Sequence, residues 1–461
     1  MATIVEKSRG TQAPPVSFER RARRHLQRIY RAAVSAAQPS LLLQKKVRIS
    51  DGCLLIRDEK SRLRFPLSGK VYLLGVGKGA DQAAPVWKKL LGDRLERGMF
   101  IVRDRLTRAP IGRISIVTAG HPLPDNDGLS ATRKALRVLS EATADDCVIV
   151  FLMGGASSLL VQPAPGLTLA DKRAATETLL KSGLGISEIN CVRKHLSGVK
   201  AGGLLRAAYP ARTLTLAISD VVGDGPSVIG SAPSFHDPTT FKQAGKILMR
   251  RHLLSKIPAR VKSHLLQGVR GEIPETLKPG NFLSRRSAFV TLGSNRVSLN
   301  AAKKMAESLG FGATVLTSTL SGDARSRARE ICRKLKAARD AQRPGGRPRC
   351  LLLGGETTVR VRGKGLGGRN QEFALASAVE LRGRPGIHLL SAGSDGSDGP
   401  TDAAGAFADG DTCLRARTLG LDPYAALRNN DSYRFFRDLG DLFRPGPTGT
   451  NVLDFVFALV Y

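Results

Sequence analysis

The sequence predicts an α/β protein of two α/β domains, with the active site in the cleft between them. Its 461 residues are enough for two or three domains. Apolar, strand-like runs alternate with stretches of helical spacing over Val71–Ser219, and a second such series begins after residue 286. This alternation indicates parallel strands joined by crossover helices. The stretch Ser263–Arg286 contains prolines, glycines and charges, which favours a hinge or linker. We expect domains at 17–280 and 287–461.

The individual elements follow from short β-branched runs and from apolar residues repeating every three or four positions. In the first series we expect strands at Val71–Gly75, Met99–Val102, Ile114–Thr118, Val148–Met153 and Thr213–Ser219, and helices at Lys78–Leu91, Gly128–Glu141, Leu169–Lys181 and Glu188–Val199. In the second series we expect strands at Ala288–Leu292, Ala313–Leu316, Cys350–Leu353, Thr358–Val361, Ile387–Ser391 and Val452–Val460, and helices at Arg296–Leu309, Asp323–Asp340 and Asn370–Leu381.

The arginine-rich N-terminal region has two interpretations. The segment Phe18–Ala36 has the composition of a transit peptide. Its apolar residues, however, fall on one helical stripe, with most arginines elsewhere, which favours a first helix packed on a domain. We expect residues 1–16 to be a disordered tail.

The composition narrows the class of protein. The net charge is +33, which would suit nucleic-acid binding, but the charge is spread along the chain and only 5% of residues are aromatic, so we expect no nucleic-acid partner. Six scattered cysteines without a C-x-x-C pair favour reduced thiols in the cytoplasm. The longest apolar run, Cys147–Met153, is too short to cross a membrane. The sequence does not decide the oligomeric state, and a homodimer is one possibility.

Two glycine-rich turns follow strands of the first series. Gly75-Val-Gly77-Lys78-Gly79-Ala80 could present backbone amides and the Lys78 charge to an anion, or could be a tight turn with an exposed lysine. As a dinucleotide fingerprint it gives only G-x-G-x-x-A. The second turn, Gly154-Gly155-Ala156-Ser157-Ser158, suits a bound phosphate or carboxylate. A G-x-S-x-G nucleophile elbow is absent, which argues against a serine hydrolase.

Charged residues add further candidates in the first domain. Arg193, Lys194 and Lys200 lie on a basic helix that is either simply solvated or contributes one charge to a substrate. Asp220 and Asp224 end a β-branched strand, a common position for a Mg²⁺ ligand or a general base.

The second domain carries three dense blocks of glycine and charge. The first contains Glu356, and the second, Gly367-Gly368-Arg369-Asn370, opens a helix. Arg369 suits bidentate binding of phosphate or carboxylate, whereas capping by Asn370 is the structural alternative. In the third block, Asp395 and Asp398 could bind metal or accept the proton of a substrate hydroxyl. The sequence does not choose between Asp220 and Asp395 for that role.

Taken together, these motifs resemble the class II glycerate 2-kinase family, whose C-terminal domain is called MOFRL. The stretches that carry the resemblance run in order from about residue 20 to the C-terminus: GVGKGA, TAGHPLPD, GGASSLL, VRKHLSGVKAGGL, SDVVGDGPSVIGSAP, LGSN, LSGDAR, GGETTV, GGRNQE, GSDGSDGPTDAAGA, NNDSYRFF and PTGTNVLD.

The resemblance implies a Rossmann-like first domain, a mixed-sheet second domain, and phosphorylation of D-glycerate on its 2-hydroxyl by ATP with Mg²⁺. It places Lys78 and Arg369 at the catalytic cleft, and we add Asp220 as the third catalytic candidate. The expected substrate- and ATP-binding residues are Gly77, Gly154, Gly155, Ser157, Ser158, Arg193, Lys200, Glu356, Asn370 and Asp395. The expected metal ligands are Asp220, Asp224 and Asp395.

The chain departs from the family pattern in small residues. Gly154-Gly-Ala-Ser-Ser158 stands where the family usually has GGGSA, Ser231-Ala-Pro-Ser234 where it has SGPT, and Gly393-Ser-Asp-Gly396 where it has GTDG. Gly225 also stands where many members carry a larger residue. These changes affect backbone contacts and keep the chemistry. The alternative function is an NAD(P)H-dependent hydroxypyruvate reductase, a label that family members have often carried.

Overall fold

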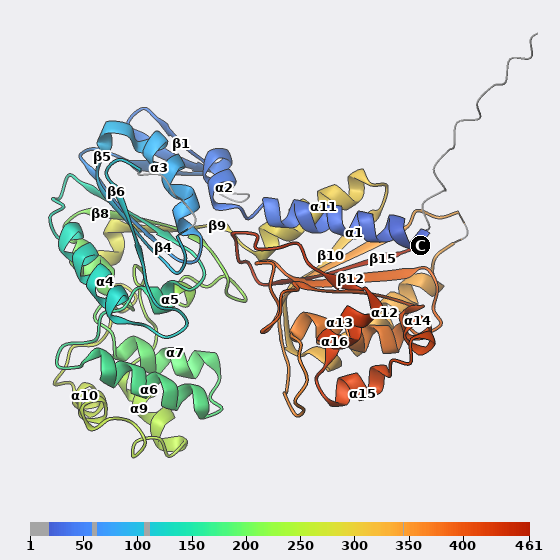
Figure 1. The fold of residues 1–461 in the computed structure, drawn as a ribbon. Coiled ribbons are helices and arrows are strands. Elements are labelled where there is room, and N and C mark those ends of the chain that lie inside the picture. The colour runs from blue at the N-terminus through green and yellow to red at the C-terminus, as the bar shows by residue number, and fades with distance from the viewer. Residues whose placement is uncertain (1–17, 58–61, 106–110, 344) are drawn as a thin grey trace, which may run out of the picture.

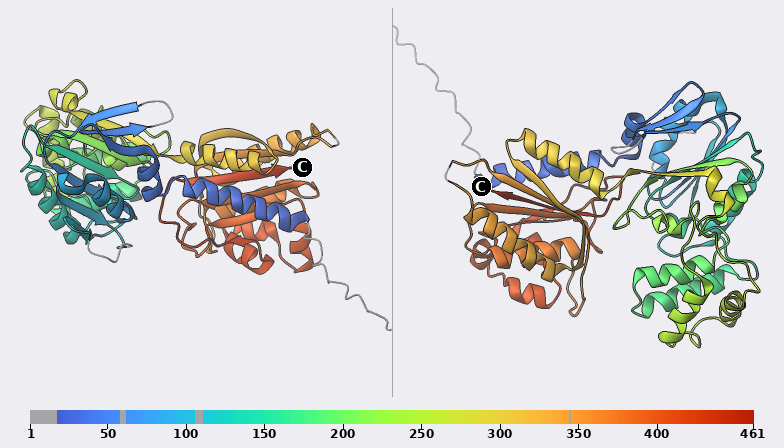
Figure 2. Two further views of the ribbon diagram at one scale, coloured as in Figure 1. Left: turned by 90° about the horizontal axis from the view of Figure 1, so that it is seen from above. Right: turned by 180° about the vertical axis from the view of Figure 1, so that it is seen from behind.

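A computed structural model describes residues 18–57, 62–105, 111–343 and 345–461. The expected disordered tail at 1–16 lies outside this part of the chain. The molecule has two lobes, each built on a six-stranded sheet (Figure 1). Seen from above and from behind, the lobes remain separate bodies joined by a few chain segments (Figure 2).

The first lobe contains a fully parallel sheet with the order β6-β5-β4-β7-β8-β9. Its strands are β4 (Val71–Val76), β5 (Leu95–Val102), β6 (Ile114–Thr118), β7 (Cys147–Leu152), β8 (Arg212–Ile218) and β9 (Ser287–Gly293). The central strands β4 and β7 are buried along their whole length. Unbroken apolar runs are what a parallel sheet covered on both faces requires.

Helices cover both faces of this sheet, so the predicted Rossmann-like architecture is confirmed. Trp87 of α3 (Ala84–Leu91) packs in the same core as Leu73, whereas Ala135 of α4 (Asn126–Leu139) packs with Leu74 on the other face. The connections between these elements contain two short helices, α5 (Ala156–Leu159) and α8 (Gly203–Ala208). They also contain 3-10 turns at Ala80–Ala83, Gly92–Arg94, Ile229–Ser231 and Phe282–Arg286.

Four helices form a separate cluster below the sheet (Figure 1). They are α6 (Leu169–Lys181), α7 (Ile186–His195), α9 (Phe241–Arg250) and α10 (Ala259–Arg270). Their apolar faces make a core of their own, centred on residues such as Leu179, Val192 and Leu248. The cluster positions the basic end of α7 next to the loops of the sheet.

A small antiparallel sheet lies at the other end of this lobe (Figure 1). It contains β1 (Val47–Ser50), β2 (Cys53–Arg57) and β3 (Arg62–Pro66), and β1 continues directly from α2 (Pro39–Lys46). The alternation of apolar and polar residues in these short strands was not recognised in the sequence. One face joins the main core through Leu54, Ile56 and Phe65.

The second lobe contains a mixed sheet, as predicted, with the order β10-β11-β15-β12-β13-β14. Its strands are β10 (Gly312–Asp323), β11 (Arg349–Thr358), β12 (Ile387–Gly393), β13 (Gly405–Asp409), β14 (Leu442–Phe443) and β15 (Asp454–Val460). Only the β10–β11 pair is parallel. The separate strand predicted at Thr358–Val361 is wrong, because β11 runs on to Thr358 and the chain then leaves the sheet.

Helices cover this sheet on both faces as well. On one face lie α1 (Phe18–Ser35) and α11 (Asn295–Ser308); on the other lie α12 (Ala324–Asp340), α13 (Arg369–Leu381), α14 (Thr412–Thr418), α15 (Pro423–Arg428) and α16 (Ser432–Leu439) (Figure 1). None of the helices in the described ranges combines the length and apolar composition needed to cross a bilayer.

Two elements cross the expected division of the chain. Strand β9, expected to begin the second domain, pairs in parallel with β8 of the first sheet. Helix α1, expected within 17–280, packs against α11 and β15 of the second lobe. Its stripe of Ala22, Leu26 and Ile29 is fully buried there, so the helix prediction is confirmed while its lobe differs. The domain ranges remain a prediction. In the structure, β9 belongs to the first lobe and α1 belongs to the second.

Hydrogen bonds tie the lobes together where the chain passes between them. Gln38 Nε2, after α1, donates to Thr448 O at 2.5 Å, and Thr450 Oγ1 donates to Ala37 O at 2.8 Å. From the first lobe, Gln82 Nε2 donates to Gly449 O at 3.1 Å. These contacts bring the loop before β15 against the carboxyl ends of the first sheet.

Candidate active site

Loops that leave the carboxyl ends of β4, β7 and β8 meet in the first lobe. The Lys78 backbone N–H donates to Gly154 O at 2.8 Å, which joins the two glycine-rich turns, and the Met153 N–H donates to Val76 O at 2.8 Å. Neighbouring parallel strands end at the same edge of a sheet, and ligands of open α/β sheets bind there. These hydrogen bonds hold the two glycine-rich turns side by side.

A cavity of about 450 Å³ opens at this edge. It is lined by Met153, Gly155, Ala156, Ser157, Ile186, Ser187, Asn190, Arg193, Asp220, Val221, Val222, Val228, Gly230, Ser231 and Glu356. Glu356, in β11, comes from the second lobe, and the other lining residues come from the first. Five of the predicted site residues therefore share one cavity: Gly155, Ser157, Arg193, Asp220 and Glu356.

Asp220 has the most perturbed carboxyl group in the cavity. Its pKa is raised from 3.8 to about 6, mainly by burial and also by the negative charge of Glu356, whereas its own backbone N–H, Lys78 and the Gly155 N–H oppose the shift. A carboxyl group with a pKa of about 6 is largely ionised at neutral pH and remains basic enough to accept a proton. This is the property expected of a general base.

The glycine at position 154 is required by the close approach of Asp220. A Cβ atom at Gly154 would lie 2.5 Å from Asp220 Oδ2. The next residue, Gly155, has φ of +86°, and a Cβ there would lie 3.1 Å from His121 Cδ2 and 3.3 Å from Lys78 Cγ. Real Cβ atoms do not approach other heavy atoms within 3.0 Å, which excludes a side chain at position 154, and the positive φ favours glycine at position 155.

Arg193 supplies the cation of the cavity. Its Nη1 donates to Asn190 Oδ1 at 3.5 Å, while its buried Nε has no hydrogen-bond partner. Among the described residues, no carboxylate lies within ion-pair distance of this guanidinium. Burial lowers the pKa of Arg193, so a bound anion would offset the cost of its charge.

Two lysines lie behind the wall that Arg193 forms. Lys200 Nζ donates to Ser157 O at 2.6 Å and to Ser157 Oγ at 3.2 Å, and Lys172 Nζ donates to Leu196 O at 3.2 Å. Burial, together with the nearby charge of Arg193, lowers the pKa of Lys172 to about 7 and shifts that of Lys200 well below its usual range. Lys200 is therefore placed to hold Ser157, and it does not line the cavity.

Ser157 also faces the loop after β8. Its Oγ lies 2.8 Å from Ser231 Oγ, so two hydroxyl groups stand together on the cavity wall. Ser158 is buried and does not line the cavity. Lys194, the remaining basic residue of this helix, is buried against Asp237 Oδ1 at 3.2 Å and has a structural role.

In the second lobe, Arg369 contacts Glu356 but does not itself line the cavity. Its Nη1 is 2.7 Å from Glu356 Oε1, and its fork is bidentate to Asp454, with Nε–Oδ2 at 2.5 Å and Nη2–Oδ1 at 3.0 Å. The side chain is 37% exposed. Burial raises the pKa of Glu356 while the Arg369 charge opposes that shift, and the carboxylates of Asp454 and Asp395 add to it. Arg369 thus orients Glu356 toward the cavity.

Asn370 and Asp398 hold the start of α13. Asp398 Oδ1 accepts the Asn370 N–H at 3.1 Å and Oδ2 accepts the Gln371 N–H at 2.9 Å. Asn370 Oδ1 accepts from Ser391 Oγ at 2.8 Å, and both side chains are buried. The helix is preceded by Gly368, which has no side chain to cap it, so Asp398 supplies the cap.

The three predicted metal ligands are not grouped. Asp220 faces Glu356 across the cavity, Asp224 is hydrogen-bonded to Ser219 and Ser294, and Asp395 Oδ1 accepts from the N–H and Oγ of Ser397 at 3.0 Å each. In the described part of the chain, no group of three or more His, Cys, Asp or Glu residues forms a metal site.

His121 lies at this edge and was missed by sequence reasoning. Burial, with the nearby charges of Lys78 and Arg103, lowers its pKa to about 4, so its imidazole is neutral at pH 7. It follows strand β6 closely, and its position after a strand of a parallel sheet was the available signal. Ser187 and Asn190 of α7 and Ser231 of the 3-10 turn after β8 were also missed, because serine and asparagine occur at many positions without function.

A second cavity of about 1000 Å³ lies between the lobes. It is lined by Gly183, Asp323, Arg325, Arg329, Thr358, Val359, Arg360 and Arg362. Arg325 Nε donates to Glu372 Oε1 at 2.6 Å, and the remaining arginines of the lining form no ion pair with a described carboxylate. Thr358 ends β11, the strand that carries Glu356, so this cationic surface continues from the first cavity.

Comparison with known proteins gives a consistent result. Residues 25–266 match the family described as a domain of unknown function (DUF4147), and residues 349–454 match the MOFRL family. The chain is 39% identical to a D-glycerate 2-kinase of Thermotoga maritima, over 85% of this chain and 91% of that protein. It is 37% identical to a glycerate 2-kinase of Pyrococcus horikoshii, over 94% and 96% of the two chains.

Solved structures agree with these relatives. The crystal structure of a glycerate kinase from Thermotoga maritima superposes with a TM-score of 0.83 at 36% identity, covering 96% of this chain and 100% of that one. A protein of Pyrococcus horikoshii superposes with a TM-score of 0.79 at the same identity, covering 95% and 98%. The chain therefore belongs to the glycerate kinase family, with a DUF4147 domain followed by a MOFRL domain.

Proposed function

We propose that this protein is a glycerate 2-kinase, which transfers the terminal phosphoryl group of ATP to the 2-hydroxyl of D-glycerate and releases 2-phosphoglycerate and ADP. The observation that carries the proposal is the meeting of Arg193, Asp220 and Glu356 in one cavity between the lobes. A small hydroxy acid needs a cation for its carboxylate and a base for its hydroxyl. Family membership supports the same activity.

Arg193 is the proposed anchor for the glycerate carboxylate. A guanidinium can bind a carboxylate through two parallel hydrogen bonds, and this one has an unpaired Nε and no ionic partner among the described residues. Ser157 and Ser231 add hydroxyl groups to the same wall. Because the 2-hydroxyl is attached to the carbon next to the carboxylate, anchoring the carboxylate brings that hydroxyl nearest to the fixed cation.

Asp220 is the proposed base. It accepts the proton of the 2-hydroxyl as that oxygen forms a bond to the terminal phosphorus of ATP, and the bond from this phosphorus to the ADP oxygen breaks. Lys78, whose positive charge acts on Asp220, is proposed to neutralise charge on the transferred group. Phosphoryl transfer depends mainly on such positioning and charge neutralisation.

The second lobe contributes further charge. Arg369 is proposed to support the transferred phosphoryl group beside Glu356, and the arginines at 329, 360 and 362 are proposed to receive the rest of the triphosphate. Asp220 and Glu356 fit an Mg²⁺ ion, since they face one cavity and each would gain from a shared cation. Such an ion would neutralise phosphate charge when bound.

Purified protein with ATP, Mg²⁺ and D-glycerate tests the activity. We expect ADP release that depends on glycerate, and a product that enolase converts without phosphoglycerate mutase. Absence of glycerate-dependent ADP would refute the kinase, and a signal that requires mutase would refute the 2-hydroxyl. Activity on NADH with hydroxypyruvate at a comparable rate would favour the reductase; the turn after β4, which leads into a four-residue 3-10 helix, gives that alternative little support.

The proposed location is the cytoplasm. All six cysteines are free and buried, which suits a reducing compartment. The proposed partners are small-molecule substrates.

A further inference from the structure

A third cavity lies on the small antiparallel sheet, outside the cleft. It has a volume of about 350 Å³ and is framed by β1, β2, β3 and the end of α2. Its lining comprises Gln44, Lys45, Lys46, Val47, Arg48, Leu55, Ile56, Arg57, Arg62, Leu63 and Arg64. Six of these eleven residues are lysine or arginine, and none is acidic. Neither the kinase reaction nor the interlobe contacts use this surface.

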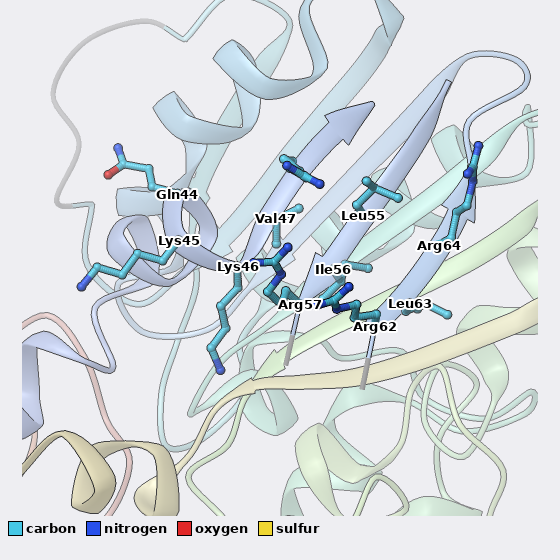
Figure 3. Close-up of a pocket in the computed structure, with 11 residues that line it drawn as sticks. Gln44, Lys45, Lys46, Val47, Leu55, Ile56, Arg57, Arg62, Leu63 and Arg64 are labelled. Atoms are coloured by element: carbon cyan, nitrogen blue, oxygen red, sulfur yellow. The ribbon is translucent and has the colours of Figure 1, made fainter. Parts of the chain in front are cut away.

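The strand register gathers the cations on one face. Arg57 of β2 pairs directly with Arg62 of β3, and Arg48 of β1 and Arg64 of β3 both pair with Leu55 between them. Figure 3 shows Arg57 and Arg62 side by side, with Arg64 farther along β3. Like charges directly opposite each other on neighbouring strands destabilise a sheet. The arrangement therefore carries a cost that a bound anion would relieve.

Few protein groups neutralise these charges. Among the described residues, no carboxylate lies within ion-pair distance of Arg48, Arg57 or Arg62. Arg64 Nε donates to Cys53 Sγ at 3.1 Å, and Asp51 is the carboxylate whose charge reaches it. Lys46 Nζ donates to Leu292 O at 2.7 Å.

We propose that this cavity binds a small molecule carrying at least two phosphate groups. The cations form two rows that run across the strands, one with Arg57 and Arg62 and the other with Arg48 and Arg64 on either side of Leu55. Positions two apart on a strand are separated by about 7 Å, so each row can hold its own phosphate group. Guanidinium forks bind phosphate oxygens in pairs.

The shape of the site favours a small ligand over a nucleic acid. A volume of about 350 Å³ is in the range of small-molecule sites. The described lining contains no aromatic side chain, whereas single-stranded nucleic acids are bound by stacking bases on aromatic rings. Leu55, which lies between Arg48 and Arg64, offers only a limited apolar contact. The inference is independent of the proposed function, because it uses no residue of the cleft.

Titration calorimetry with inorganic tripolyphosphate, at about 0.15 M salt, tests the site. A protein with Arg329→Gln, Arg360→Gln and Arg362→Gln serves as background, so that binding at the proposed triphosphate surface of the cleft does not contribute. We expect one binding event, weakened about tenfold or more by the added pair Arg57→Gln/Arg62→Gln. The matched pair Arg133→Gln/Arg137→Gln changes two exposed arginines of α4 that form no ion pair with a described carboxylate. It removes the same charge and should leave the affinity unchanged.

A melting experiment gives a second readout. Tripolyphosphate should raise the Tm of this background protein and not that of the background protein with Arg57→Gln/Arg62→Gln, whose own Tm should be no lower because a like-charge pair is gone. Arg48→Gln is the second variant and should also weaken binding. Equal affinity in the site and control pairs would overturn the proposal. The proposal would also be overturned if single-stranded polyuridylate bound more tightly than tripolyphosphate and if the same variants lost this binding.

Discussion

At the scale of single residues, Asp220 is the group on which the proposed chemistry depends. Replacing it with asparagine should lower kcat by about 10²–10⁴-fold, as expected when a general base is lost. In the wild type, kcat/KM should rise with pH through about 6, where Asp220 loses its proton. Steady-state kinetics from pH 5 to 8 measure both effects. Asp224→Asn, outside the cavity, is the control, and an equal loss in it would contradict the assignment.

The same pKa shift has a consequence for stability. Because the folded pKa of about 6 is above the ordinary value of 3.8, the folded state binds the proton more tightly. This stabilising contribution is fully present below pH ~4 and is lost as the pH rises through ~6. Asp220→Asn should therefore be more stable than the wild type at pH 7, on the order of 1–2 kcal/mol. Urea unfolding at several pH values measures the difference.

Arg193 is expected to act on substrate binding. Arg193→Ala should raise the KM for D-glycerate by about 10–100-fold, since a charge-assisted anchor is removed. Arg193→Lys should recover only part of the loss, because an ammonium group lacks the planar fork. The KM for ATP should change little. An increase in the KM for ATP alone would place Arg193 at the nucleotide instead.

The glycine at 154 tests the packing of the site without touching its charges. Gly154→Ala would push a methyl group to 2.5 Å from Asp220 Oδ2, so we expect Asp220 to move and activity to fall by about tenfold or more. Gly225→Ala is the matched control, because its Cβ would meet only Val228 Cγ2 at 3.8 Å. Activity and circular dichroism of both variants measure the effect. Full activity in Gly154→Ala would show that this contact does not fix Asp220.

At the scale of elements, the start of α13 depends on a cap from a distant loop. Asp398, which follows β12, accepts the N–H groups of Asn370 and Gln371. Asp398→Ala should cost about 1–3 kcal/mol of stability, because two buried donors lose their acceptor. Asp395→Ala, which breaks only contacts within its own turn, should cost much less. Urea denaturation compares them, and equal losses would contradict a specific capping role.

At the scale of the whole molecule, α1 stabilises the lobe that is most distant in the sequence. Leu26 and Ile29 of α1 are fully buried where this helix packs on the second sheet. Leu26→Ala should destabilise the protein by about 2–5 kcal/mol. Limited proteolysis should then cleave the second lobe first, whereas Arg28→Ala on the exposed face should behave like the wild type. Cleavage that begins in the first lobe would contradict this packing.

The sequence by itself determined the alternation of strands and helices and the positions of the glycine-rich turns. These features are local, since period, β-branching and glycine act within a few residues. The turns after β4 and β7 and the carboxylate after β8 could be placed together because parallel strands end at one edge. Gly155, Ser157 and Asp220 lie on these strand ends, and all three line the cavity.

Only the tertiary structure decided what each charge contacts. Arg193 and Lys200 look alike in the sequence, yet Arg193 faces the cavity and Lys200 is buried against Ser157. Arg369 is bidentate to Asp454, 85 residues away in the chain. The placement of α1 and β9 likewise depends on partners far along the sequence. A charge or an apolar stripe shows what must be satisfied, and long-range packing decides which partner satisfies it.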